Sequence, residues 1–307
     1  MQKPPLAVFG LGRMGAQIAR RLHASGFTVS AWNRSPEPAA EVASAGVSAT
    51  TDLKEAVSKL PAGQRIFWVM LPQAVVDDFL FGKDQLGAYL QKGDIVIDGG
   101  NSFYKDSMRR GERMALKGIS YFDCGTSGGV WGEKEGFALM VGGPKEQWKA
   151  VEPIFAALSS GDNYAHVGSS GAGHFTKMVH NGIEYGMMEA IGEGYAVLEA
   201  GPFKLDLAAV TRVYQKGSVV RSWLIDLCRN IFEHEDIAAT SGKIDATGEG
   251  EWTVQAGKEF GVDVRVIEDS LAVRRESADP KNQQKYSNKI VALLRKQFGG
   301  HAIHSSK

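Results

Sequence analysis

One run of residues combines five polar groups that could move protons or bind a polar substrate. Residues 174–185 read HFTKMVHNGIEY, and helical spacing places positions 177, 180, 181, 184 and 185 on one face. A solvated charged face is the common explanation of such a stripe. Here, however, charged, amide and aromatic groups alternate, and the helix has a separate apolar side. We therefore predict a catalytic face formed by Lys177, His180, Asn181, Glu184 and Tyr185.

A glycine-rich segment near the start of the chain has the spacing of a phosphate-binding turn. The segment GLGRMG follows an apolar run at 6–9 and precedes a helical pattern at 16–24. Its glycines allow a tight turn, an approach of backbone N–H groups to a pyrophosphate, and close packing of the helix on a sheet. This context favours a dinucleotide site over a turn without a ligand. The residues are Gly10, Leu11, Gly12, Arg13, Met14 and Gly15.

The end of the second predicted strand bears on which dinucleotide is bound. An NAD-selective site usually has Asp or Glu there to hold the ribose 2′-hydroxyl, but this chain has Asn33, Arg34 and Ser35. A guanidinium can bind a 2′-phosphate, although an exposed arginine is also common without a ligand. The pattern favours NADP without excluding NAD, and it leaves the preference ratio open. Met70 and Leu71 complete the predicted cofactor set.

Two segments at strand ends add polar groups at the edge where open α/β sheets bind ligands. Asn101, in the run DGGNS, could contact both cofactor and substrate, although the run is equally typical of a turn. The run DCGTSGG offers a hydroxyl and bare N–H groups to a carboxylate or phosphate. Taken alone, it favours a structural turn. Its candidate residues are Ser127, Gly128 and Gly129.

The order of the predicted elements decides how these groups are positioned. Short apolar runs alternate with helical stretches as far as residue 168, and later segments are almost all helical in pattern. This is typical of βαβ units. We predict an α/β fold with a Rossmann-type, doubly wound, mainly parallel sheet, followed by an all-helical C-terminal domain. The dinucleotide-binding domain covers 1–168, and a substrate and oligomerisation domain with a C-terminal tail covers 169–307. Strands are predicted at 6–9, 27–32, 66–71, 95–98, 119–122, 137–141 and 164–167.

The composition excludes several classes of protein. Thirty-five basic and 35 acidic residues give zero net charge, so no global field attracts nucleic acid or an anionic membrane. The apolar run at 66–71 is too short to cross a bilayer, and the first residues lack the apolar part of a secretory signal. Two cysteines without metal-ligand spacing fit a reducing compartment. We expect a cytoplasmic protein that binds neither nucleic acid nor a membrane.

Together these motifs closely resemble the 6-phosphogluconate dehydrogenase family, within the β-hydroxyacid dehydrogenase superfamily. The resemblance covers nearly the whole chain, through GLGRMG, NRS, DGGNSFY, SGG, KMVHNGIEYG and RKQFGGH. The length is similar to that of the short form, which has a single helical repeat. The resemblance implies a decarboxylating oxidoreductase that converts 6-phospho-D-gluconate to ribulose 5-phosphate and CO2 with NADP or NAD. It also implies a role in gluconate utilization and the pentose phosphate pathway, and no metal.

The same resemblance implies roles for individual residues. Lys177 would be the general base that removes the proton of the substrate's C3 hydroxyl, and Glu184 the acid that protonates C1 of the enediol. This chemistry requires a lysine that is neutral near the working pH and a carboxyl group that stays protonated. The residues that would orient the sugar acid are Asn101, Ser127, Gly128, Gly129, His180 and Asn181.

The resemblance also implies a phosphate subsite and a shared active site. Tyr185 and Arg274 match phosphate-binding positions of the family. Arg295 and His301 match tail residues that a neighbouring subunit supplies, which implies a homodimer or homotetramer; the alternative is a frayed terminus. One departure concerns the family's lysine in KGTGKW, which is Thr247 in the run TGEGEW of this chain. How the phosphate is held there is left open.

Two other functions stay as alternatives. The first is a non-decarboxylating β-hydroxyacid dehydrogenase of the 3-hydroxyisobutyrate type, which would need fewer cations than this chain offers. The second is a non-catalytic dinucleotide-binding sensor, which need not retain both Lys177 and Glu184. The sequence leaves open the number of subunits beyond one, and whether Cys124 is packed or open to oxidation.

Overall fold

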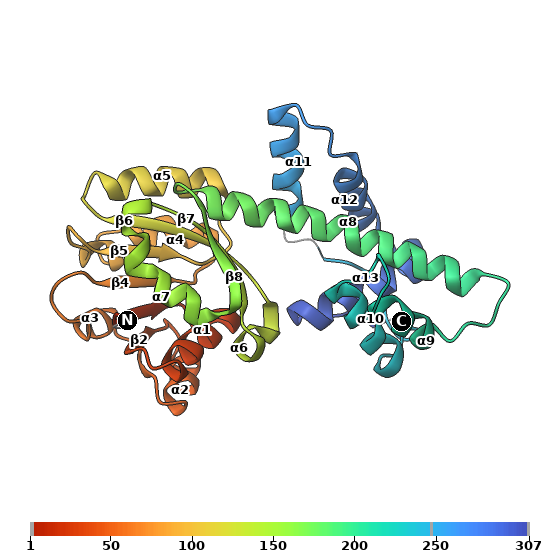
Figure 1. Ribbon diagram of the computed structural model, residues 1–307, viewed down its shortest axis with the longest axis horizontal. Coiled ribbons are helices and arrows are strands. Elements are labelled where there is room, and N and C mark those ends of the chain that lie inside the picture. The colour runs from red at the N-terminus through yellow and green to blue at the C-terminus, as the bar shows by residue number, and fades with distance from the viewer. Residues whose placement is uncertain (1–2, 246–247, 306–307) are drawn as a thin grey trace. The chain divides into compact units, whose positions relative to one another are not determined.

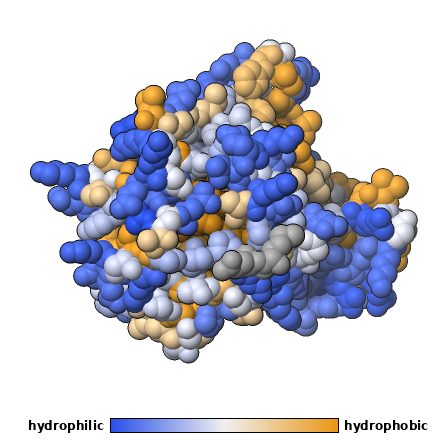
Figure 2. All heavy atoms as spheres, turned by 60° about the vertical axis from the view of Figure 1, so that its left-hand side comes forward, coloured by the Kyte–Doolittle hydropathy of each residue, from blue (hydrophilic) through white to orange (hydrophobic). Residues whose placement is uncertain are grey.

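The computed structural model describes residues 3–245 and 248–305 of the 307-residue chain. The chain divides into two compact units, Met1–Met178 and Val179–Lys307. Thr247, singled out above, lies outside the described residues. No helix of the described ranges is long and apolar enough to cross a membrane. On the face shown in Figure 2, hydrophilic side chains predominate and apolar ones form small groups.

The first unit is built on one eight-stranded sheet (Figure 1). The strand order is β3-β2-β1-β4-β5-β6-β7-β8, and every neighbouring pair is parallel except β6 and β7. The predicted mainly parallel sheet is therefore confirmed. The strands are β1 (Leu6–Phe9), β2 (Val29–Trp32), β3 (Ser48–Thr50), β4 (Ile66–Val69), β5 (Ile95–Asp98), β6 (Ser120–Ser127), β7 (Phe137–Gly142) and β8 (Ser159–Gly168).

Helices connect these strands and bury one side each against the sheet. In α1, for example, Ile18, Ala19 and Leu22 are fully buried. In α3, the Asp52 carboxylate caps the first turn by accepting from the N–H of Glu55 at 3.0 Å. The helices are α1 (Arg13–Ala24), α2 (Pro36–Ser44), α3 (Leu53–Ser58), α4 (Gln73–Phe81), α5 (Tyr104–Ala115), α6 (Gly132–Glu135) and α7 (Trp148–Leu158).

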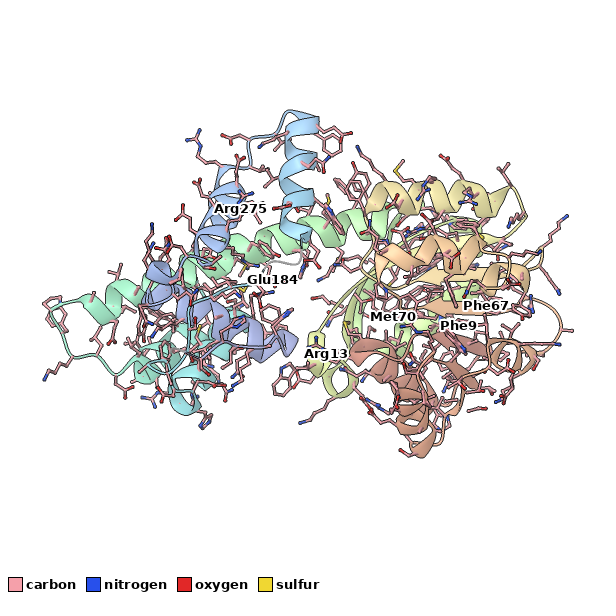
Figure 3. The ribbon with its side chains drawn as sticks, turned by 180° about the vertical axis from the view of Figure 1, so that it is seen from behind. Phe9, Arg13, Phe67, Met70, Glu184 and Arg275 are labelled. Atoms are coloured by element: carbon pink, nitrogen blue, oxygen red, sulfur yellow. The ribbon has the colours of Figure 1, made fainter. Side chains whose placement is uncertain are left out.

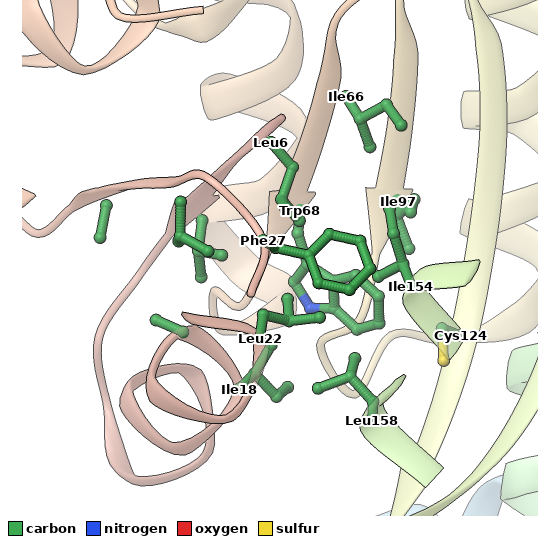
Figure 4. Close-up of a cluster of buried hydrophobic side chains, with 14 of the residues drawn as sticks. Leu6, Ile18, Leu22, Phe27, Ile66, Trp68, Ile97, Cys124, Ile154 and Leu158 are labelled. Carbon is green, nitrogen blue, oxygen red and sulfur yellow. The ribbon is translucent and has the colours of Figure 1, made fainter. Parts of the chain in front are cut away.

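Apolar side chains pack on both faces of this sheet. Leu6 and Val8 of β1 belong to one buried cluster, whereas Ala7 and Phe9 belong to another. Successive residues of a strand point to opposite faces, so a strand buried on both sides must be apolar throughout. Figure 4 shows the first cluster, in which Cys124 of β6 lies among aliphatic and aromatic side chains.

The second unit is helical in its described residues, apart from an isolated bridge between Thr240 and Ser305. Helix α8 (Ala172–Ala200) begins in the first unit and continues into the second. Ile290 to Leu294 of α13 cover more than a full turn, are buried on all sides of the helix and belong to the buried cluster of this unit. The other helices are α9 (Leu207–Gln215), α10 (Trp223–His234), α11 (Glu249–Phe260), α12 (Arg265–Glu276) and α13 (Tyr286–Gly299). The predicted all-helical second part is thus confirmed.

Candidate active site

The glycine-rich turn joins β1 to α1. Gly10 has a φ of 91°, and a methyl group there would collide with the carbonyl oxygen of Met70. A methyl group at Gly15 would collide with the carbonyl oxygen of Gly10. Gly12 differs, because no atom lies within 4 Å of the place where its methyl group would be. Open space therefore adjoins the N-terminus of α1, where backbone N–H groups and the helix dipole favour an anion.

Five other residues of the predicted cofactor set lie in this turn or beside it. Met70 and Leu71, which follow β4, both contact Gly10. Leu11 is buried and Met14 is half-buried. Arg13 is the exposed first residue of α1 (Figure 3). The arrangement leaves Arg13 and the open side of Gly12 accessible from solvent.

Asn33 fixes the turn from the neighbouring strand. Its Oδ1 accepts a hydrogen bond from the backbone N–H of Leu11 at 2.9 Å, and its Nδ2 donates to the carbonyl oxygen of Ser35 at 3.1 Å. Asn33 therefore holds the turn and the end of β2 together. Arg34 and Ser35 are exposed directly beyond β2. At the end of β2 an NAD-selective site would have a carboxylate, whereas this chain has the cation Arg34.

The loop that contains Asn101 rests on a buried carboxylate. Asp98, at the end of β5, is inaccessible to solvent and accepts from the N–H of Gly100 at 3.2 Å. It also accepts from the hydroxyls of Ser102 and Tyr121, each at 3.0 Å, and from Nη1 of Arg110 at 3.2 Å. Burial raises the pKa of Tyr121, and the charge of Asp98 adds to this effect, so the phenol stays a donor. The network fixes the loop while Asn101 itself is exposed.

Sequence reasoning missed Arg110 in this network. The guanidinium is almost fully buried, and it binds Asp77 through Nε at 3.0 Å as well as Asp98. Its helical spacing from the buried Ser107 and Met114 of α5 is the signal that could have identified it, because a buried arginine is nearly always paired.

The next predicted segment is part of a strand and not a loop. We predicted that the strand ends at 122, but β6 continues to Ser127, so Asp123 to Ser127 pair with β7. The apolar pattern that predicted the strand stops at Asp123 because this residue is polar. Its carboxylate is nevertheless buried, since it is paired with amides that are distant in sequence. Beyond Ser127 the chain turns at Gly128 and Gly129, whose φ values of 133° and 53° favour glycine. The predicted hydroxyl and bare N–H groups lie at this turn.

Lys177 lies in the first turns of α8, which β6 holds at two points. The carboxylate of Asp123 accepts from the N–H of Gly171 at 2.6 Å and from that of His174 at 2.7 Å, and so caps the helix. Gly125 then contacts Lys177 directly, because a methyl group at Gly125 would collide with Cβ of Lys177. The position of Lys177 relative to β6 is therefore fixed by backbone packing as well as by hydrogen bonds.

The second unit contains the rest of the predicted catalytic face. Nδ1 of His180 lies 3.1 Å from Oδ1 of Asn181 and 3.8 Å from Oε2 of Glu184. The side chains of His180 and Glu184 are 37% and 22% exposed, so this group is partly open to solvent. Figure 3 shows Glu184 on α8. Lys177 and Glu184 are seven residues apart on one continuous helix, which is close to two full turns.

Tyr185 and Arg274 form a buried pair with unsatisfied donors. The guanidinium of Arg274 stacks on the ring of Tyr185, 3.3 Å from its centroid. Within the described part of the chain, the Tyr185 hydroxyl and Nε and Nη1 of Arg274 have no hydrogen-bond partner. Arg295 of α13 is also buried, and its pKa is lowered by burial and by the charge of Arg274. Buried polar groups normally have partners, so the unused donors of Tyr185 and Arg274 indicate a site for an anion.

His301 follows the end of α13. Its ring contacts Gly299 and lies edge-on to the ring of Phe298, with 6.3 Å between the ring centroids. Helix α13 ends at Gly299 and is capped by Gly300, whose φ of 59° is left-handed and suits glycine. The run FGGH therefore forms a defined helix end with the imidazole folded back on it.

The cysteines are buried in the two units. Cys124 and Cys228 are both free and inaccessible to solvent. Burial raises the pKa of the Cys228 thiol to about 12, and it raises that of Cys124 further. Both are therefore packed core residues and poor nucleophiles.

Comparison with known proteins identifies the same family for both units. Residues 5–168 match the family model described as the NAD binding domain of 6-phosphogluconate dehydrogenase, and residues 173–304 match the model of its C-terminal domain. The chain is 41% identical to the Bacillus subtilis protein YqeC over 298 residues, which cover 97% of this chain and 98% of YqeC. It is 39% identical to a decarboxylating, NAD(+)-dependent 6-phosphogluconate dehydrogenase of Haloferax volcanii, with the same two coverages.

Solved structures support this assignment. The 6-phosphogluconate dehydrogenase of Plasmodium falciparum is 27% identical, with a TM-score of 0.81 over 90% of this chain and 62% of that chain. A 3-hydroxyisobutyrate dehydrogenase of Mycobacterium tuberculosis is 21% identical with a TM-score of 0.74. At that identity the second similarity shows a shared fold alone.

Proposed function

Because this chain belongs to the 6-phosphogluconate dehydrogenase family, we propose that it oxidises and decarboxylates 6-phospho-D-gluconate to ribulose 5-phosphate and CO2, with NADP or NAD. The observation that supports this substrate best is the buried pair of Tyr185 and Arg274, whose unused donors suit a phosphate. A small unphosphorylated hydroxy acid carries a single anionic group, its reacting carboxylate, and so has no second anion for these donors.

The fit of a dinucleotide is supported by the open space at Gly12 and the exposed cation Arg34. Gly10, Leu11, Gly12, Arg13, Met14 and Gly15 would hold the pyrophosphate, and Asn33, Arg34, Ser35, Met70, Leu71 and Asn101 the rest of the cofactor. When bound, the nicotinamide accepts the hydride from C3 of the substrate. Arg34 favours NADP because it can bind a 2′-phosphate.

In this proposal Lys177 and Glu184 move the protons. The Lys177 amine removes the C3 hydroxyl proton as C3 is oxidised, giving a 3-keto acid and a lysine ammonium. The bond between C1 and C2 then breaks, CO2 leaves, and the ammonium donates to the ketone oxygen as the electron pair forms an enediol. Glu184 protonates the terminal carbon of that enediol while Lys177 takes back the hydroxyl proton, which gives the ketose. Asn101, Ser127, Gly128, Gly129, His180 and Asn181 orient the substrate.

The experiment that tests this function compares substrates and nucleotides. NADPH or NADH formation is followed with 6-phosphogluconate and with 3-hydroxyisobutyrate, and released CO2 is measured in parallel. We expect reduction with 6-phosphogluconate and one CO2 for each nucleotide reduced. Reduction with 3-hydroxyisobutyrate alone would identify the non-decarboxylating alternative, and no reduction with either would favour a sensor.

We further propose a cytoplasmic homodimer or homotetramer in which Arg295 and His301 complete the site of a neighbouring subunit. The packed helix end at His301 supports a functional tail. The test mixes two inactive variants, Lys177→Met and His301→Ala, after mild dissociation. In a shared site, mixed dimers contain one site with both changes and one with neither, so activity returns. If each chain supplies its own tail, the mixture stays inactive.

A further inference from the structure

Glu189 is a buried carboxyl group that the proposed reaction does not use. It lies one turn after Tyr185 on α8, and only 6% of its side chain is exposed. Its Oε1 lies 3.6 Å from Nε of Arg274, which is too long for a hydrogen bond. Within the described residues neither carboxyl oxygen has a hydrogen-bond partner. A buried carboxylate therefore faces the guanidinium whose own donors are unused.

We propose that Glu189 determines the charge of the phosphate subsite and takes up a proton when a phosphate ester binds there. This inference rests on the proposed function, because that function assigns the phosphate to Tyr185 and Arg274. Arg274 supplies one positive charge beside Tyr185, and an ionised Glu189 cancels it. A phosphate ester therefore meets a net positive charge at Arg274 only when Glu189 is neutral. Protonation also removes a negative charge from beside the bound phosphate.

The other charged groups near this site come from α8, α11, α12, α13 and the segment that precedes α11. Glu193 lies one turn further along α8, and Arg274 approaches from α12. Arg295 of α13 interacts with Arg274, and Asp245 and Glu249 interact with Arg295.

These surroundings make Glu189 sensitive to pH near neutrality. Burial raises its pKa to about 7, Arg274 opposes this, and Glu193 adds to it. The carboxyl group thus changes protonation in the range where a phosphate monoester, with a second pKa of about 6, becomes a dianion. Above pH 7 the enzyme must take up a proton for each phosphate ester bound, so binding weakens by up to about tenfold per pH unit.

The test measures proton uptake directly. Titration calorimetry of 6-phosphogluconate into the full-length enzyme at pH 8, in two buffers of different ionisation enthalpy, gives the number of protons taken up on binding. We expect close to one proton for the unaltered enzyme and close to none for Glu189→Gln, which keeps the shape and removes the charge. Glu199→Gln, an exposed position further along the same helix that does not act on Glu189, is the control and should behave as the unaltered enzyme. Gluconate, which has no phosphate, should cause no uptake.

Each outcome decides the matter. If the unaltered enzyme binds and oxidises 6-phosphogluconate without proton uptake at pH 8, the inference is wrong and the proposed function stands; this holds even if Glu189→Gln does not fold. Equal uptake by the enzyme and by Glu189→Gln also refutes the inference, since the proton then goes elsewhere. If the enzyme neither binds nor oxidises 6-phosphogluconate, the proposed function fails and the inference fails with it.

Discussion

Replacing Gly125 by alanine should displace the proposed base without touching any ligand. Gly125 lies in β6 with an ordinary strand conformation, so the backbone itself tolerates alanine. The added methyl group would collide with Cβ of Lys177 and lie 2.9 Å from the carbonyl oxygen of Gly173 and 3.1 Å from Cγ of Lys177. Since ordinary contact begins near 3.4 Å, the start of α8 has to move by about 0.5 Å at Gly173 and by more at Lys177.

The size of the effect follows from this displacement. Forcing a methyl group into a packed contact costs about 1–3 kcal/mol of stability. A misplacement of about 1 Å in a catalytic group lowers the rate by about 100-fold. We therefore expect kcat with 6-phosphogluconate to fall by about 100-fold in Gly125→Ala. The Kd for the nucleotide should stay unchanged, because the turn at Gly10 is formed by other strands.

Gly194→Ala is the matched control on the same helix. No atom lies within 4 Å of the place of its methyl group, and an exposed helical glycine is less favourable than alanine by about 1 kcal/mol. This variant should therefore raise the thermal midpoint and leave kcat unchanged. Steady-state kinetics, nucleotide titration and thermal melting of both variants complete the assay. Retention of more than half of the activity by Gly125→Ala would refute the view that β6 positions Lys177 by close packing.

Four further predictions concern single residues. Lys177→Met should lower kcat by about 1000-fold, as expected for loss of a general base, with nucleotide binding intact; substantial activity would exclude Lys177 as the base. Arg34→Ala should raise KM for NADP about tenfold or more and that for NAD little, since a charge-assisted hydrogen bond contributes about 1.5–3 kcal/mol; equal changes would show that Arg34 does not bind the 2′-phosphate. Cys124 and Cys228 should resist a thiol reagent in the native enzyme and react in denaturant, so rapid native labelling would contradict their burial. Because the pKa of Glu189 is higher in the folded than in the unfolded chain, the protonated group contributes its full stabilisation below about pH 4.5. This contribution is lost as the pH rises to about 7. The loss amounts to roughly 3 kcal/mol and should be absent from denaturant unfolding of Glu189→Gln.

The parts of the fold that were predicted have strong local patterns. The run at β4 is apolar throughout and lies in the middle of a sheet covered on both faces. The missed elements have weak patterns: β3 is three residues long with no buried residue, and α2 buries only Ala39 and Val42. The domain boundary at 168/169 stays a prediction; it precedes α8, whereas the compact units divide within that helix, at Met178.

Sequence reasoning proposed those parts of the candidate site whose residues are close both in sequence and in space. The glycine-rich turn and the polar face of α8 are of this kind. What the sequence could not reveal are pairings across long separations, such as that of Asp123 with the N–H groups of Gly171 and His174. The hydrogen bond from Leu11 to Asn33 is another. No periodicity encodes them, because each depends on how separate elements pack.

Three buried carboxyl groups adjoin segments that the proposed function uses, and they differ in one respect. Asp98 supports the loop of Asn101, and Asp123 caps the helix of Lys177, and in both every carboxyl oxygen has at least one donor. Such fully paired groups make a site rigid. Glu189 lies behind Arg274 with neither oxygen paired. Burying an unpaired carboxylate is costly enough that the group is expected to accept a proton instead. The first two carboxylates therefore fix geometry, whereas the third is the one that can change its charge when an anion binds.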